Sequence, residues 1–201
     1  MKRIFITSWD DGRKQDLELA AMLLNLKIPA IFYIPTCTEL SDQRIIDLAR
    51  HFEIGGHTKT HPQDLKLLDD AALLEEIGSN AEWLRGLTGQ RVTSFCYPRG
   101  RYNDNVIEVV KAYGFENART TVVLNTEIPI DSFRIKTTIH VHPSRVEYGG
   151  RKWFELANEL WEWVKNEGGY FHLWGHSWEI EKYQLWDELE SFLRRVAPDL
   201  K

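Results

Sequence analysis

Residues 3–24 read RIFITSWDDGRKQDLELAAMLL, and this stretch decides the fold. Its first part, from Arg3 to Trp9, is a short and mostly apolar run that is typical of a β-strand, and the charged turn at residues 10–12 ends it. From Leu17 to Leu24, apolar residues recur at helical spacing. The stretch therefore predicts one strand–turn–helix unit.

The same alternation continues along the chain. Further strands are expected near residues 30–34, 53–56, 94–97 and 170–174, with extended runs at 118–124 and 133–141, and helices near 45–49, 69–84, 106–113, 153–165 and 183–196. Strands that alternate with helices of about 10 to 15 residues favour a parallel sheet built from βα units. For 201 residues we expect an α/β fold with one domain, residues 1–201, and a closed or nearly closed barrel.

The composition is that of a folded protein without a nucleic-acid partner. Hydrophobic residues make up 43% and charged residues 27% of the chain, which excludes a disordered or collagen-like protein. The net charge of −5 lacks the basic surface that nucleic-acid binders usually carry. Cys37 and Cys96 are too few and too far apart for a disulfide framework or a structural zinc site, which favours a reducing compartment.

Apolar runs are only a few residues long, far short of the roughly 20 residues that a membrane helix needs. No signal peptide or transmembrane segment is visible, so we expect a cytoplasmic protein with no membrane partner. The sequence does not predict the oligomeric state.

In a barrel of βα units the reactive residues lie at the carboxyl ends of the strands, because the loops that follow converge on one face. His57 and His61 follow the expected strand at 53–56, and their i, i+4 spacing would place them on one helical face, where they can hold one metal ion. A surface pair at a helix start is the alternative. Gly55-Gly56 favours the ligand interpretation, because a tight turn there places His57 at the strand end.

Two more groups of residues belong to the same expected edge. Asp10 and Asp11 are adjacent carboxylates that point in different directions, so one can coordinate a cation while the other accepts a proton; a solvated acidic turn is the simpler interpretation. With the two histidines, a carboxylate completes a three-ligand set that leaves a coordination position open for water, as catalytic zinc sites require. His176, in the loop after the last strand, is the candidate acid.

Two further features each allow two interpretations. His140 and His142 have the i, i+2 spacing of side chains on one strand face and could form a second metal pair. No carboxylate lies nearby in the sequence and Pro143 follows at once, so separate polar histidines are favoured. The eight Trp residues, most of them in the second half, suit either core packing or stacking on sugar rings.

Four segments, in this order along the chain, resemble motifs of the polysaccharide deacetylase family, also called the NodB-homology domain or carbohydrate esterase family 4. Residues 8–12, Ser-Trp-Asp-Asp-Gly, resemble Thr-Phe-Asp-Asp-Gly, and residues 57–61, His-Thr-Lys-Thr-His, resemble His-Ser/Thr-x-x-His. Residues 95–100, Phe-Cys-Tyr-Pro-Arg-Gly, resemble Phe-Arg-Pro-Pro-Tyr-Gly, and residues 173–177, Leu-Trp-Gly-His-Ser, resemble Leu-x-x-His. The resemblance spans nearly the whole chain.

The resemblance implies a distorted (β/α) barrel of about seven strands that holds a divalent metal, with zinc as the first expectation. It implies three metal ligands, two catalytic side chains and one backbone donor. The ligands would be Asp11, His57 and His61; the general base would be Asp10 and the acid His176; the backbone N–H at Arg99 would share the charge that develops on the carbonyl oxygen.

The resemblance also implies where the substrate lies. The third motif lines the groove in the family, and aromatic rings near the loops can stack on sugar faces. The candidate substrate contacts are therefore Tyr97, Pro98, Tyr102 and Trp174, with Trp178 as a further ring that could stack.

The chain departs from the family pattern in two places. Cys96 stands where many members have the Arg that orients the base, so Arg99, Arg101 or Arg119 takes that role, or none does. The family's fourth motif, an Asp-Trp pair near the fifth strand, is not evident in residues 116–121, which leaves the substrate open.

We therefore expect a hydrolase in which a divalent metal holds the water that attacks the amide of an N-acetylated sugar. Its partner would be a carbohydrate or a small N-acetylated compound. One alternative keeps the metal and hydrolyses cyclic amides or imides on the same scaffold. The other is a carbohydrate-binding protein without catalysis, against which Asp10 argues, because binding alone needs no general base.

Overall fold

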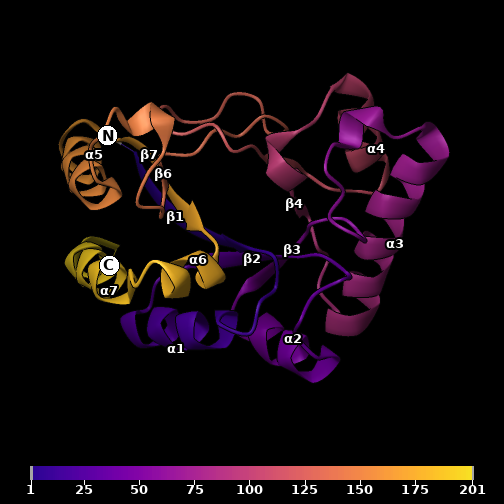
Figure 1. Cartoon of the computed structure of the whole chain (residues 1–201), viewed down its shortest axis with the longest axis horizontal. Helices are drawn as coiled ribbons and strands as arrows, with labels where there is room; N and C mark the ends of the chain where they lie inside the picture. Colours follow the sequence, from indigo (N-terminus) through magenta and orange to yellow (C-terminus); the bar gives the residue numbers. More distant parts are fainter. Residues whose placement is uncertain (1, 201) are drawn as a thin grey trace.

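The computed structural model describes residues 2–200. Strands and helices alternate along them, with the strands at the centre and the helices outside (Figure 1). The order is β1 (Arg3–Asp10), α1 (Asp16–Leu26), β2 (Ala30–Ile34), α2 (Asp42–Ala49), β3 (Glu53–Gly56), η1 (Leu65–Leu67), α3 (Asp70–Thr88), β4 (Ser94–Cys96), η2 (Pro98–Gly100), α4 (Asp104–Ala112), β5 (Asn117–Arg119), β6 (Ile139–His140), η3 (Val146–Tyr148), α5 (Trp153–Glu167), β7 (Gly169–Gly175), α6 (Ser177–Lys182), α7 (Trp186–Val196) and η4 (Ala197–Leu200).

The seven strands form one parallel sheet in the order β5-β4-β3-β2-β1-β7-β6. The sheet curls, and residues 120–138 cross between its outer strands β5 and β6: Thr120 N–H donates to Ile135 and Leu124 N–H to Thr138. The architecture confirms the expected α/β fold, a distorted (β/α) barrel of seven strands. Because all strands are parallel, their carboxyl ends meet at one edge.

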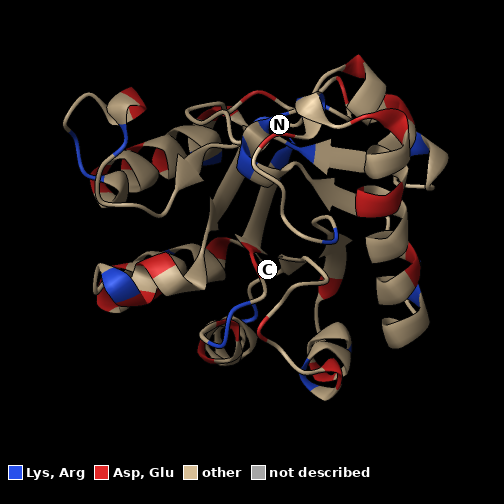
Figure 2. Ribbon diagram, turned by 45° about the vertical axis from the view of Figure 1, so that its right-hand side comes forward, with Lys and Arg blue, Asp and Glu red and all other residues tan. Residues whose placement is uncertain are grey.

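Burial explains the strands, and capping explains where helices begin. All five residues of β2 are buried, as expected for a strand of a parallel sheet that is covered on both faces. Asp69 accepts a hydrogen bond from Ala72 N–H before α3, and Asn103 does the same for Val106 N–H before α4. Acidic and basic residues are interspersed on the outer helices and loops, whereas the central strands carry few of them (Figure 2).

Two expectations from the sequence are wrong in detail. The extended runs at 118–124 and 133–141 form only the short strands β5 and β6, because most of their hydrogen bonds join one run to the other within the crossing segment. The helix expected at 183–196 begins only at Trp186, as α7, and a separate helix that was not expected, α6, precedes it. Gln184 takes a left-handed backbone conformation, with φ 56°, and this interrupts the helical hydrogen bonding between them.

Four of the eight tryptophans whose role was open are core residues. Trp9, Trp153, Trp161 and Trp174 are each at most 2% exposed, whereas Trp163 is 48% exposed. Among residues 2–200, no helix combines the length and the apolar character that crossing a membrane requires.

A buried carboxyl group ties the last part of the chain to α1. Ser177 Oγ donates to Asp16 Oδ1 at 2.5 Å, and Arg13 N–H donates to Asp16 Oδ2 at 3.1 Å. Burial raises the pKa of Asp16 to about 7, although both hydrogen bonds oppose the shift. Asp16 therefore holds its proton in the folded protein at pH values where the unfolded chain has lost it.

This proton makes stability depend on pH. The contribution of Asp16 to the free energy of unfolding is fully present below the pKa that Asp16 has in the unfolded chain. It is lost as the pH rises through about 7, the pKa in the folded protein. We expect Asp16→Asn, which imitates the neutral acid, to be no less stable than wild type at pH 4 and more stable by a few kcal/mol at pH 8. Urea unfolding with EDTA at several pH values measures this. Asp42→Asn is the matched control, since Asp42 also begins a helix but is exposed; equal curves for Asp16→Asn and wild type would contradict the prediction.

Candidate active site

The residues selected from the sequence meet at the carboxyl edge of the sheet. Asp10 ends β1, His57 follows β3, Arg119 ends β5 and His176 follows β7. Asp10, His57 and His176 help to line a cavity of about 300 Å³. Its lining residues are Asp10, Asp11, His57, His61, Arg99, Thr121, Trp174, His176 and Trp178.

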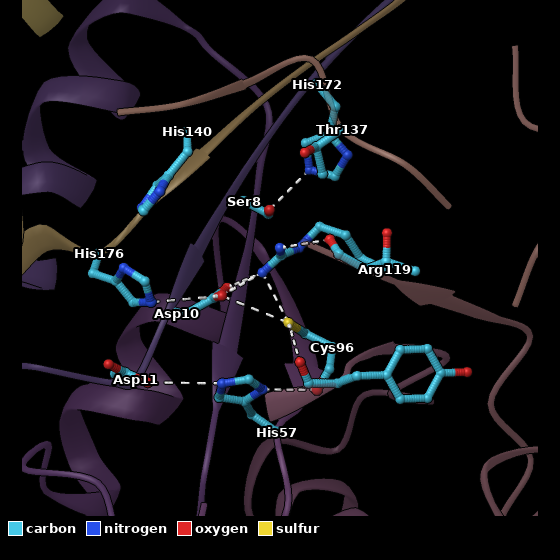
Figure 3. A network of polar contacts seen from close by, with 12 residues as sticks. Ser8, Asp10, Asp11, His57, Cys96, Arg119, Thr137, His140, His172 and His176 are labelled. Carbon is cyan, nitrogen blue, oxygen red and sulfur yellow. Dashed lines mark hydrogen bonds and ion pairs between the residues drawn. The ribbon is translucent and has the colours of Figure 1, made fainter. Parts of the chain in front are cut away.

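Asp11, His57 and His61 present a metal-ligand set on one wall of this cavity. The Asp11 Oδ1 atom lies 3.7 Å from His57 Nε2 and 3.5 Å from His61 Nε2. The three donor atoms all lie within 4.8 Å of one another. Figure 3 shows the Asp11 carboxylate facing the His57 ring. One divalent cation at the centre of such a set would contact all three.

The i, i+4 spacing had suggested that the two histidines share a helical face, but they do not. Residues 57–61 form a loop after β3, in which Thr58 and His61 take positive φ values of 68° and 55°. These turns bring His61 back beside His57, with ring centroids 4.9 Å apart. The predicted convergence is therefore present, but an irregular loop produces it.

Hydrogen bonds on the far side of each ligand favour cation binding. His57 Nδ1 lies 2.8 Å from the Cys96 carbonyl oxygen, which can only accept, so Nδ1 donates and Nε2 is left to face the set. Trp178 Nε1 donates to Asp11 Oδ2 at 2.9 Å, which leaves Oδ1 directed at the histidines. Burial lowers the pKa of His61 to about 4, so this ring is neutral and free to bind near pH 7. The donor set thus fits zinc or a similar divalent metal.

Asp10 lies beside this set in a buried ion pair. Arg119 Nη2 donates to both Asp10 carboxylate oxygens and lies 2.8 Å from Cys96 Sγ (Figure 3). Both side chains are at most 4% exposed. Burial acts to raise the pKa of Asp10, but the charge and hydrogen bond of Arg119 together with the neighbouring His57 and His176 outweigh it and hold this pKa below its usual value. Asp10 is therefore a carboxylate.

The structure resolves which Arg contacts the predicted base. Arg119, from β5, lies against Asp10, whereas the exposed Arg101 pairs with Asp64 at 3.1 Å. Arg99 lines the cavity from η2, where its backbone takes a left-handed φ of 57°. The small thiol of Cys96, at the family's Arg position, leaves room for the Arg119 guanidinium.

His176 lies next to Asp10 on the cavity wall. Its Nε2 is 4.0 Å from Asp10 Oδ2, and its Nδ1 is 2.6 Å from Glu179 Oε2. Burial acts to lower the pKa of His176, but the hydrogen bond to Glu179 and the nearby carboxylates outweigh it and raise this pKa. The predicted acid therefore keeps its second ring proton to a higher pH than a free imidazole would.

Three of the candidate substrate contacts do not line the cavity. Tyr97 is fully buried in the hydrophobic core, where its hydroxyl donates to the Phe133 carbonyl at 3.0 Å, and Pro98 is buried next to it. Tyr102 stacks on Tyr97 at a centroid distance of 4.3 Å. Tyr97 and Pro98 shape the loop instead of meeting a ligand, so these two expectations are wrong. Tyr102 is partly exposed and packs against the core, and its role as a substrate contact stays a prediction.

Trp174 does line the cavity, but it cannot stack on a sugar ring. His140 lies parallel to its indole ring at a centroid distance of 3.9 Å. The Arg119 guanidinium carbon lies 4.4 Å from the same ring centre, and two groups this close must occupy opposite faces. Both faces are thus covered, and only an edge of Trp174 is available. Trp178 is the partly exposed ring of this wall.

Sequence reasoning missed Thr121 and Glu179, and it wrongly favoured His140 and His142 as separate polar histidines, whereas both lie at Glu179. Thr121 lines the cavity, and Glu179 and His140 lie behind His176. The i, i+3 spacing of His176 and Glu179 was the available signal for Glu179. Nothing in the local sequence indicates that β6 would bring His140 to the same place.

Comparison with known proteins identifies the family. The family model described as "Polysaccharide deacetylase" matches residues 1–118. The chain belongs to the polysaccharide deacetylase family. No curated protein matches it.

Solved structures of this family share the fold. A Mycobacterium smegmatis protein described as a polysaccharide deacetylase has a TM-score of 0.74 at 15% identity, over 98% of this chain and 85% of its own. The Bc1960 peptidoglycan N-acetylglucosamine deacetylase has a TM-score of 0.69 at 17% identity, over 99% of this chain and 82% of its own.

Not every deacetylase-like structure is an active enzyme. BA3943 of Bacillus anthracis, described as a pseudoenzyme of carbohydrate esterase family 4, has a TM-score of 0.64 at 14% identity over 98% of this chain. This chain spans 62% of that protein and 62% of the Streptococcus pyogenes deacetylase PplD. Activity in this chain therefore has to be argued from its own residues.

The hydrogen bond from Trp178 predicts an effect on metal affinity. We expect Trp178→Phe, which keeps a ring but removes the donor to Asp11, to weaken zinc binding about 10- to 100-fold. Competition with a chromophoric chelator measures this. Trp186→Phe is the matched control, because its Nε1 donates to Glu181 on the surface at 2.7 Å; equal affinities in the two variants would count against the role of Trp178.

Proposed function

We propose that this chain is a metal-dependent hydrolase that removes acetyl groups from N-acetylated sugars and releases acetate and a free amine. One observation carries the proposal. The Asp11–His57–His61 set, Asp10 and His176 all line a single cavity. Hydrolysis of an amide needs these three parts: an electrophile, a base and an acid.

The ligand set supports a divalent metal, and two histidines with a carboxylate are typical of catalytic zinc. A bound cation would polarise the acyl carbonyl and make water more acidic. Asp11, His57 and His61 would hold it, and Trp178 and the Cys96 carbonyl would orient two of these ligands.

Asp10 is placed to accept the proton of the attacking water at a carboxylate oxygen. Arg119 donates to the carboxylate and keeps it charged and fixed, so its orientation is set before substrate binds. His176 then gives its Nε2 proton to the nitrogen as the C–N bond breaks. The acyl carbon thus gains the hydroxyl of the water, and the remaining proton of the water stays on Asp10 until the products are released. The amine leaves in its neutral form.

Arg99 is proposed to act through its backbone. Its left-handed conformation is at the turn of η2 on the cavity wall. From there its N–H would donate to the carbonyl oxygen as negative charge develops, a contribution that typically amounts to about 10²–10³ in rate.

Acetate release tests the proposal against its rivals. Zinc-loaded protein is incubated with N-acetylglucosamine oligomers, peptidoglycan fragments and small N-acetyl compounds, and free acetate is measured. Release of acetate supports a deacetylase. Ring opening of a cyclic imide without acetate release supports the imide hydrolase, and saturable binding of an oligomer with no product supports a non-catalytic protein like the pseudoenzymes of this fold.

Asp10→Asn separates the base from the metal site. The variant keeps the shape of the side chain and all three proposed ligands, so we expect full zinc content and a loss of turnover of about 10²–10⁴-fold, as for removal of a general base. Metal analysis and acetate release on the same sample measure both. Turnover near the wild-type rate would exclude Asp10 as the base.

A further inference from the structure

His176 also belongs to a second polar cluster, which contains His140, His142 and Glu179. Glu179 Oε2 lies 2.6 Å from His176 Nδ1 and 2.9 Å from His140 Nε2. His142 Nε2 lies 3.6 Å from the other oxygen of Glu179. His140 and Glu179 are 6% and 8% exposed, so this carboxylate takes its hydrogen bonds from protein groups (Figure 3 shows His140 above His176).

The proton positions in this cluster follow from Arg145. Its Nη1 lies 3.1 Å from His140 Nδ1, and a guanidinium can only donate. His140 Nδ1 is therefore the acceptor, and the ring proton is on Nε2, directed at Glu179. Arg145 is itself held by two hydrogen bonds to Glu147. The ring of His140 is fixed further by its stack on Trp174.

The same atoms could be taken for a second metal site, since His140, His176 and Glu179 have donor atoms within 4.8 Å of one another. Two facts oppose this. Both nitrogens of His140 are already hydrogen-bonded. The Arg145 guanidinium also places a positive charge beside the ring, which disfavours a cation there.

We propose that His140 and Arg145 are positioning residues for the acid of the reaction: Arg145 holds His140 in the Nε2–H tautomer, His140 fixes Glu179, and Glu179 binds His176 at Nδ1 and so directs its Nε2 at the cavity. The inference rests on the proposed function and extends it. It assigns to β6 and the loop after it a part in protonating the leaving amine.

A comparison of two substrates tests this. An amide loses an amine that needs a proton, whereas 4-nitrophenyl acetate loses a phenolate that needs none. We expect His140→Phe, which keeps a ring against Trp174 but cannot donate, to lower kcat for an N-acetylglucosamine tetramer about 10- to 100-fold, part of the roughly 10²–10⁴ typical of a general acid. KM, zinc content and the rate on 4-nitrophenyl acetate should stay near wild type.

His140→Gln is the matched rescue. Its amide Nε2 can donate at nearly the place of His140 Nε2, so we expect kcat on the tetramer within a few-fold of wild type. If His140→Phe lowers the rate equally on both substrates, His140 has a structural role. If kcat on the tetramer is unchanged in His140→Phe, His140 has no role in the reaction. Either result overturns the inference. If the wild-type protein cleaves 4-nitrophenyl acetate but no amide, that result instead contradicts the proposed function itself.

A spectroscopic measurement needs no substrate. In ¹H–¹⁵N spectra of zinc-loaded protein, His140 should be neutral with its proton on Nε2, and His176 should carry a proton on Nδ1. A charged His140, an Nδ1–H tautomer, or binding of a second zinc ion that changes the His140 signals would overturn the assignment.

Discussion

Asp11→Ala is expected to abolish zinc binding and nearly all turnover. Asp11 is the only anionic member of the proposed ligand set and its Oδ1 faces both histidines. A metal contributes several kcal/mol to such a reaction, and each ~1.4 kcal/mol is a factor of ten, so the loss should exceed about 10³-fold. His57→Ala and His61→Ala should behave alike. Metal content after dialysis and acetate release measure the two effects.

The control for these substitutions is His51→Ala, because His51 is exposed and distant from the ligand set in the fold. It should keep both zinc and activity. Full zinc occupancy in Asp11→Ala or His57→Ala would defeat the ligand assignment. Zinc loss without loss of turnover would show that the metal is not used in the reaction.

Arg119→Met is expected to cause the largest loss of stability. Removing one partner of a buried ion pair leaves an uncompensated charge, here on Asp10, and typically costs about 3–5 kcal/mol. For a chain of this size that corresponds to a fall in Tm of roughly 6–20 °C. Thermal unfolding measures this fall in Tm. EDTA is present so that no bound metal stabilises the Asp10 carboxylate.

Two variants make this result specific. Arg134→Met removes an Arg whose pairs with Asp104 and Asp131 are exposed, and should change stability by at most about 1 kcal/mol. Arg119→Met combined with Asp10→Asn removes both charges and should recover much of the loss. If Arg119→Met alone unfolds at the wild-type temperature, the buried pair does not support the site as described.

Much of the site was accessible from the sequence because its parts are local. Adjacent carboxylates after a strand, two histidines four residues apart and a histidine after the last strand are each short patterns, and the barrel brings strand ends together. The substrate contacts were less accessible. Whether Tyr97 faces the cavity or the core depends on side-chain packing, and packing joins residues from distant segments.

The choice among three arginines shows the same limit. Arg99 and Arg101 are close to Cys96 in the sequence, yet the guanidinium beside Asp10 comes from Arg119. Strand order decides this, because β5 and β4 are neighbours and the Arg119 side chain reaches across to the end of β1. Arg119 is 109 residues from Asp10 in the sequence, and the spacing within a short motif cannot reveal a contact over that separation.

The sequence by itself determined the alternation of strands and helices, and with it the parallel barrel and the edge on which Asp10, Asp11, His57 and His176 gather. It could do so because periodicity and turn residues act within a few positions of the chain. Only the tertiary structure decided that Arg119 pairs with Asp10, that both faces of Trp174 are covered, and that His140 and Glu179 support His176. Those contacts join separate strands, and their geometry exists only once the sheet has curled and the side chains have packed.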